Sequence, residues 1–75
     1  MDDLQTLDAL DRAGVEIMLS GFRDVGVDAK VGNRRGGPVS EKSFASHAEA
    51  ARWCIEESLR LYPGILDQAP EGGHP

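Results

Sequence analysis

The residues that could carry out covalent chemistry are the single thiol, Cys54, and the histidine seven positions before it, His47. A thiol beside an imidazole performs nucleophilic catalysis only if the two side chains lie within hydrogen-bonding distance of each other. If both residues are on one helix, a rise of roughly 1.5 Å per residue separates them by about 10 Å along the axis. We therefore expect no catalytic pair, a buried and unreactive Cys54, and a solvated His47.

The other motifs of enzymes and of metal sites are missing from the sequence. The glycines lack the spacing of a dinucleotide-binding turn, and none is followed by the lysine and serine or threonine of a phosphate-binding loop. No cysteine and histidine spacing matches a zinc site. Three carboxylates, Glu49, Glu56 and Glu57, are spread along a polar helix surface, which is typical of a solubilising face. The sequence thus predicts a protein that is not an enzyme and that needs no metal and no cofactor.

Length and composition describe a small acidic domain. The chain has 75 residues, of which 40% are hydrophobic, and a net charge of -5. A core of this size provides roughly 3–5 kcal/mol of stability, and a single cysteine cannot add an internal disulfide. We therefore expect a cytoplasmic protein without a membrane segment and with a tendency to form a homodimer. The negative charge argues against direct binding to nucleic-acid phosphates.

Hydrophobic spacing predicts a short helix at the start of the chain, over residues 2–13. The leucines that would face the core fall on one stripe, at Leu4, Leu7 and Leu10. Aspartates occupy the first turn of this helix, and Gly14 follows its last turn, as glycine does at many helix ends.

Alternating patterns predict strands after this helix. Apolar residues alternate with polar ones over residues 15–20 and 27–31, the pattern of half-buried strands. The short segment 23–26 between them predicts an antiparallel hairpin. Residues 33–38 are rich in glycine and predict a loop, and residues 39–44 predict a third strand with charges in its middle, as edge strands often have.

A second helix is predicted from Ser46. The residues Ser46 to Glu49 form a capping box, in which the serine hydroxyl accepts the Glu49 amide and the glutamate side chain accepts the serine amide. Residues 63–64, Pro-Gly, end the helix. Ile65 and Leu66 are expected to fold back onto the core. The stripe expected to cover the sheet consists of Ala48, Ala51, Ile55, Leu59 and Tyr62, with Cys54 and Ser58 beside it.

Together these elements predict an α+β fold in the order α-β-β-β-α, with the long C-terminal helix packed on one face of a three-stranded antiparallel sheet. Residues 1–66 would form the single domain, and residues 67–75 a flexible C-terminal tail. The other face of the sheet stays open, or is covered by the first helix or by a second copy of the chain. Its outward residues are predicted to be Glu16, Met18, Asp28, Lys30 and Lys42.

Trp53 is the most informative side chain of the second helix. At about 100° per residue it points roughly 160° away from Ile55, into a surface that otherwise carries charges. The sequence leaves two placements open. The indole either packs on Ile65, Leu66 or the first helix, or it is exposed or buried at an interface with a partner, where aromatic residues are often binding hot spots.

The loop at residues 33–38 contains the only adjacent pair of basic residues, Arg34 and Arg35. Two guanidinium groups can bind a carboxylate or a phosphate while the flexible backbone adapts. The same composition is typical of an exposed hairpin end. Both interpretations stay open, and Arg34 and Arg35 are candidates for an anion or partner contact.

The order of the elements, with the stretch from Ser46 to Arg52, resembles the last part of a double-stranded RNA-binding domain. That family carries a lysine pair where this chain has His47 and Ala48, so the resemblance implies the fold without the phosphate contacts. Residues 15–62 are similar to the partial ribonuclease-H-like domain of HicB-type antitoxins. In size and charge the chain resembles small phage-encoded inhibitors, including anti-CRISPR proteins.

The leading hypothesis is a small acidic protein-binding regulator, of the type of a phage inhibitor that acts on a nucleic-acid-handling complex in the host cytoplasm. Charge complementarity favours a partner with a basic surface. The residues expected to contact it are Glu49, Trp53, Glu56, Glu57 and Arg60. One alternative is a nucleic-acid-binding module that uses the Arg34-Arg35 loop with Lys30 and Lys42. Another is a structural subunit that acts as a homo-oligomer.

Overall fold

The structure, a computed structural model, describes residues 2–22 and 26–67. Its elements are α1 (Asp3–Arg12), β1 (Val15–Phe22), β2 (Gly26–Asn33), β3 (Ser40–Phe44), α2 (His47–Leu61) and the 3-10 helix η1 (Ile65–Asp67). They confirm the predicted α+β fold and its order, α-β-β-β-α. The turn predicted from residue 23 falls mostly on residues 23–25, outside the described residues, and Gly26 already belongs to β2. Of the predicted tail, Asp67 belongs to η1, and residues 68–75 lie outside the described residues.

The three strands form one antiparallel sheet in the order β1-β2-β3, so β2 is central. The side chains of Val27, Ala29 and Val31 in β2 are buried and alternate with exposed ones, as predicted. Strand β3 begins at Ser40 and not at the predicted Val39, because the ladder with β2 ends at the pair Val31 and Ser40. Val39 lies outside the ladder, and its side chain is exposed.

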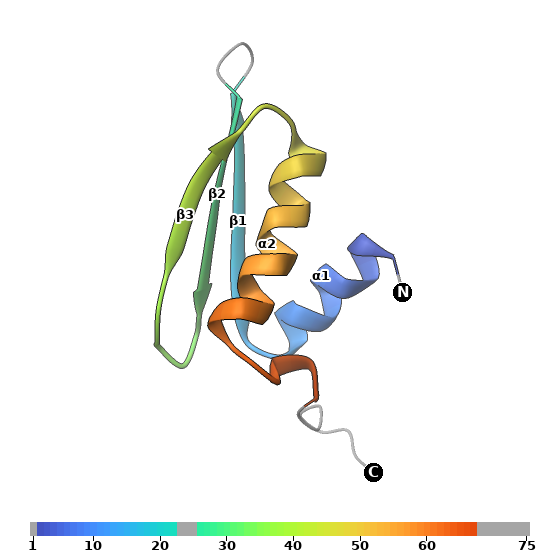
Figure 1. The fold of residues 1–75 in the computed structure, drawn as a ribbon, viewed down its shortest axis with the longest axis vertical. Coiled ribbons are helices and arrows are strands. Elements are labelled where there is room, and N and C mark those ends of the chain that lie inside the picture. The colour runs from blue at the N-terminus through green and yellow to red at the C-terminus, as the bar shows by residue number, and fades with distance from the viewer. Residues whose placement is uncertain (1, 23–25, 68–75) are drawn as a thin grey trace.

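Both helices lie on the same face of the sheet (Figure 1). Helix α2 contacts all three strands, and α1 lies beside α2 against β1. The core fills the space between the helices and the sheet. It consists of Leu10, Val15, Val27, Ala29, Val31, Ala50, Cys54, Ile55 and Ile65. Within residues 2–22 and 26–67, no helix or strand covers the opposite face of the sheet.

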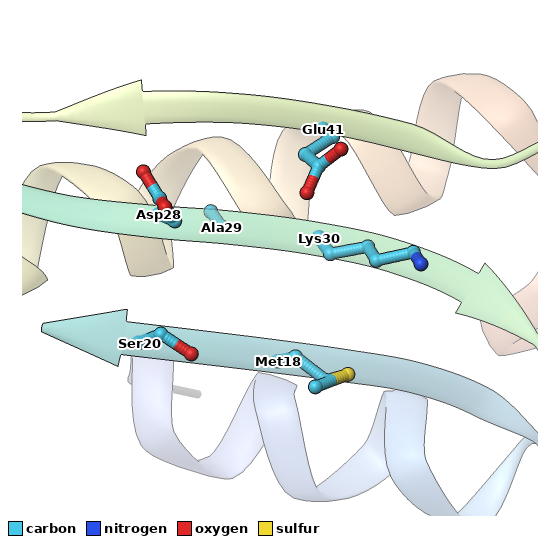
Figure 2. A pocket seen from close by; sticks show the side chains of 6 residues that line it. All are labelled: Met18, Ser20, Asp28, Ala29, Lys30 and Glu41. Atoms are coloured by element: carbon cyan, nitrogen blue, oxygen red, sulfur yellow. The ribbon is translucent and has the colours of Figure 1, made fainter.

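This open face carries mainly polar side chains around a shallow hollow of about 180 Å³ (Figure 2). The residues of the hollow are Met18, Ser20, Asp28, Ala29, Lys30 and Glu41. The placement of Lys42 on this face was wrong. Lys42 is the ladder partner of Ala29, whose side chain is buried, and directly paired residues point to the same side of a sheet. Lys42 therefore lies on the face that the helices cover.

Helix α1 begins with a capping box that was not among the predicted features. Asp2 accepts the amide of Gln5 at 2.8 Å, and the Gln5 side chain accepts the amide of Asp2 at 2.9 Å. Leu10 is fully buried and Leu7 half-buried, but Leu4 is 75% exposed, so the prediction that Leu4 faces the core was wrong. The reason is the tilt of α1, whose N-terminal end lies farther from the sheet than its C-terminal end (Figure 1).

Helix α2 begins as predicted, with the Ser46 hydroxyl accepting the Glu49 amide at 3.2 Å. The second half of the predicted capping box differs, because the Glu49 carboxylate accepts from that same hydroxyl. The helix is also rotated relative to the predicted stripe. Its buried residues are Ala50, Cys54, Ile55 and Ser58, whereas Ala48 and Leu59 are exposed. Small side chains thus face the sheet and allow a close approach of helix and strands.

The chain after α2 returns to the core as predicted. Ile65 is buried and Leu66 is half-buried against the core. Tyr62, at the end of α2, donates its hydroxyl hydrogen to the carbonyl of Pro38 in the loop between β2 and β3. Burial raises the pKa of Tyr62 above its ordinary value, which keeps the hydroxyl protonated and able to donate.

Candidate functional site

The indole of Trp53 packs on the ring of Phe44 at the end of β3. The ring centroids are 5.4 Å apart and the ring planes are inclined by 47°, a tilted aromatic pair. Trp53 is half-buried and also packs against the core, and the Lys42 ammonium lies 5.5 Å from the centroid of Phe44. Of the two placements that the sequence left open, Trp53 therefore takes one within its own chain. The rotation of α2 turns Trp53 toward β3, and its aromatic partner is not one of the predicted residues.

A shallow groove borders this aromatic pair on the outer side of α2. It is lined by Phe44, Ala48, Glu49, Arg52, Trp53 and Glu56. The structure thus brings together three residues of the predicted partner-binding set, Glu49, Trp53 and Glu56. We refer to these six residues as the aromatic groove. It has an apolar base and carboxylates on its rim, so it can take an apolar side chain with cationic groups beside it.

Arg52 is the only basic residue that lines the aromatic groove, and acidic partners neutralise it. Its guanidinium group lies 3.0 Å from the Asp3 carboxylate in α1 and 3.5 Å from the Glu56 carboxylate one turn further along α2. The Glu49 carboxylate accepts a hydrogen bond from the Ser46 hydroxyl, which is a neutral donor and leaves the negative charge of Glu49 uncompensated by that contact. With Asp3 counted, the rim carries more negative than positive charge.

The remaining two residues of the predicted set, Glu57 and Arg60, form an ion pair with each other, and Glu57 also forms a hydrogen bond with β3. The Glu57 side chain is only 12% exposed, accepts Arg60 Nε at 2.8 Å, and accepts the hydroxyl of Ser40 in β3. The hydrogen bonds from Arg60 and Ser40 lower the pKa of Glu57 from 4.5 to about 2. The same pairing with Glu57 raises the pKa of Arg60. These contacts give Glu57 a structural role that a solubilising surface glutamate lacks.

Glu57 should therefore make stability depend on pH at the acidic end. Because its pKa is lower in the folded chain, its stabilisation is complete above about pH 4.5 and is lost as the pH falls toward 2. We expect Glu57→Gln to lower Tm at pH 7, and the difference from the wild type to disappear near pH 2. Thermal unfolding followed by circular dichroism measures both values. Glu56→Gln, at an exposed position, is the control and should change Tm little. An equal loss at both pH values for Glu57→Gln would show that the charge is not responsible.

Of the two arginines of the predicted anion-binding pair, Arg34 is held by contacts with α1. The Arg34 guanidinium donates to the carbonyl of Asp11 at the end of α1 and lies 3.8 Å from the Asp11 carboxylate. A cation at this position also compensates the negative end of the helix dipole. The Arg35 amide donates to the Asn33 side chain at 2.9 Å. Arg34 thus fastens the loop to α1, and a ligand would have to compete with those contacts.

The two residues that could carry out covalent chemistry, Cys54 and His47, have different surroundings. Cys54 is fully buried, and this burial raises the pKa of its thiol to about 11, which disfavours the reactive thiolate. The exposed His47 lies against β1, where a Cβ on Gly21 would be 2.5 Å from the ring carbon Cε1. Within the described part of the chain, no group of three or more His, Cys, Asp and Glu residues could hold a metal ion. Nor does this part contain a helix that is long and apolar enough to span a membrane.

Comparisons with known proteins give no matching family model, no similar curated protein and no similar solved structure. The resemblances to double-stranded RNA-binding domains, HicB-type antitoxins and phage inhibitors therefore stay predictions.

Proposed function

We propose that the protein is a small acidic protein-binding regulator that holds a basic segment of its partner in the aromatic groove. The observation that carries this proposal is the half-buried pair of Phe44 and Trp53 beside the carboxylates of Glu49 and Glu56. Interfaces commonly have an aromatic centre that gives most of the binding energy and a polar rim that selects the partner. Here the rim selects for positive charge.

The net charge of -5 supports the same partner class. A negative protein attracts a positive surface over distances of about a Debye length, roughly 8 Å at physiological salt, and this raises the association rate. Proteins that handle nucleic acids present such basic surfaces. Inhibition of one of them, in the manner of an anti-CRISPR protein, is the specific form of regulator that we propose.

The alternative of direct nucleic-acid binding has less support in the geometry. It relies on four basic residues, Arg34, Arg35, Lys30 and Lys42. These residues do not share one surface, because Lys30 lies on the open face of the sheet and Lys42 on the helix-covered face. Arg34 is engaged with Asp11. Phosphate binding requires several cations along one track, and the described residues do not provide one.

The test is a selection of binding peptides from a random library on the immobilised protein. We expect the selected peptides to contain an apolar residue flanked by lysine or arginine. Trp53→Ala should weaken their binding by about 30-fold, mainly through faster dissociation, because it removes the aromatic anchor. The double variant Glu49→Gln, Glu56→Gln should lower the association rate and its dependence on salt.

Two controls separate binding from folding. Each variant must retain the circular dichroism spectrum of the wild type, and Trp53→Phe should recover part of the affinity because it restores an aromatic contact with Phe44. Met18→Ala changes an exposed apolar residue on the other face of the sheet and should leave binding unchanged. Selection of acidic peptides, or binding that depends on Arg34 and Arg35 and not on Trp53, would refute the proposal.

A further inference from the structure

The two edges of the sheet differ in how well they are protected against pairing with another strand. Edge strand β3 has five residues, two of which are the charged Glu41 and Lys42, and short charged edges resist pairing. Edge strand β1 has eight residues, Val15–Phe22, and its only charged residue is Glu16. It contains no proline, and the described ladder shows no bulge in it. By these criteria β1 is the less protected edge, although α1 lies against it on the helix side of the sheet.

The register shows which backbone groups this edge offers. The amide of Arg34 donates to the carbonyl of Gly14 at 2.9 Å, so this pair is hydrogen-bonded in the continuation of the β1–β2 ladder. Hydrogen-bonded and non-hydrogen-bonded pairs alternate along an antiparallel ladder. The amides and carbonyls of Glu16, Met18 and Ser20 therefore point toward β2. The amides and carbonyls of the alternate residues point to the free edge, namely those of Val15, Ile17, Leu19 and Gly21.

The side chains along this edge define what an added strand must present. Ile17 and Leu19 are on the helix side of the sheet and remain partly exposed, with Leu19 36% exposed. On the open side, Met18 is 60% exposed, and the charged residues of that face are mainly acidic, with Glu16, Asp28 and Glu41 against Lys30. A strand beside β1 would thus meet apolar groups on one side and negative charge on the other.

We propose that β1 is a docking edge for an extended segment of a protein partner in which apolar and basic residues alternate. The segment adds a fourth strand, with its apolar residues opposite Ile17 and Leu19 and its basic residues on the side of Glu16. This surface is separate from the aromatic groove, so the inference does not depend on the function proposed for that groove.

A second copy of the chain fits this edge less well. Two copies of β1 related by a two-fold axis would place both helix layers on the same side of one continuous sheet. Helix α1 lies alongside the free edge of β1, behind the strand in Figure 2, so the two copies of α1 would meet at the joint. Each of these helices, with its cap, carries four aspartates against the single Arg12, and two of the four, Asp3 and Asp11, are paired with Arg52 and Arg34. The charges of Asp2 and Asp8 add to the negative side of each helix. Their repulsion favours a partner strand that brings positive charge.

The probe for the test is an eight-residue peptide of alternating lysine and valine. The backbone nitrogens of its lysines are methylated, so that only its valine edge can pair. We expect this peptide at millimolar concentration to slow hydrogen exchange of the Ile17 and Leu19 amides, measured by NMR, and to leave those of Glu41 and Ser43 on β3 unchanged. A glutamate and valine peptide of the same design should bind about tenfold more weakly or worse.

A backbone substitution supplies the matched pair of variants. The 75-residue chain can be assembled by chemical ligation with an N-methyl group on the amide of Leu19, which removes one edge donor and keeps the β1–β2 ladder. This variant should lose peptide binding, whereas N-methylation of Glu41 on the other edge should not, and Trp53→Ala should leave this binding intact. Failure of the lysine peptide to protect Ile17 and Leu19 would overturn the inference. So would equal binding of the glutamate peptide, or protection of these amides in the free protein together with a dimeric mass.

Discussion

Replacement of Gly26 by alanine is expected to destabilise the fold by about 3 kcal/mol or more, which approaches the whole stability of a domain of this size. Gly26 has a φ of 107°, which an L-residue rarely adopts. A Cβ there would also lie 2.5 Å from the carbonyl oxygen of Phe44. This oxygen belongs to the backbone of β3, so the clash cannot be relieved by a side-chain rotation. The variant can fold only if β3 moves away from β2.

The matched control is Gly36→Ala in the loop between β2 and β3. Gly36 also has a positive φ, 90°, but a Cβ there meets nothing within 4 Å. Only the backbone strain remains, and the expected loss is about 1 kcal/mol. Urea denaturation of the two variants and the wild type, followed by circular dichroism, gives both differences. Equal losses for the two variants would show that contact with Phe44 does not determine the need for glycine at position 26.

Leu10→Ala is the second substitution with a large expected effect. Leu10 is the one residue of α1 that is fully buried, and it belongs to the hydrophobic core. Truncation of a buried leucine removes its transfer free energy and leaves a cavity, with a typical loss of about 3–5 kcal/mol. Because α1 has no other fully buried side chain, we expect the helix to detach from the sheet in this variant.

Leu4→Ala on the same helix tests the opposite expectation. Leu4 is 75% exposed, so its removal should change the free energy of unfolding by less than about 0.5 kcal/mol. Denaturation curves of the two leucine variants, with amide exchange of α1 as the local probe, distinguish the positions. A similar loss for both would mean that the predicted leucine stripe, and not the tilt of α1 in Figure 1, describes how the helix packs.

Those parts of the fold that depend on neighbouring residues could be predicted from the sequence. The alternation along β2, the N-cap at Ser46 and the return of Ile65 to the core each follow from a few adjacent side chains. The rotation of α2 could not be predicted in this way. The predicted stripe contained Ala48 and Leu59, which are exposed, and had Cys54 and Ser58 only at its side. The helix instead approaches the sheet through Ala50, Cys54, Ile55 and Ser58. Only the folded structure shows that the close approach of α2 to the sheet favours small side chains at Ala50, Cys54 and Ser58.

The candidate site shows the same division. Glu49, Trp53 and Glu56 share one helix, so their gathering could be predicted from helical spacing alone. The contribution of Phe44 could not, because it depends on the register of β3 and on the rotation of α2. The attachment of Glu57 to Ser40 joins residues of two elements, and the sequence carried no local signal for it. The residue types in the sequence indicate which interactions each of these side chains can make. The tertiary contacts determine which side chains remain available to bind a partner.

The loop between β2 and β3 is fastened by residues that are distant in the chain. Arg34 donates to a carbonyl 23 positions away and Tyr62 to one 24 positions away. Ordering long chain segments before any contact forms is entropically unfavourable, so we expect these links to form after the β1–β2 hairpin and outside the folding nucleus. Interactions that are absent from the transition state act on the unfolding rate. We therefore expect the two links to slow unfolding, and so to lengthen the lifetime of the native state, more than they speed folding.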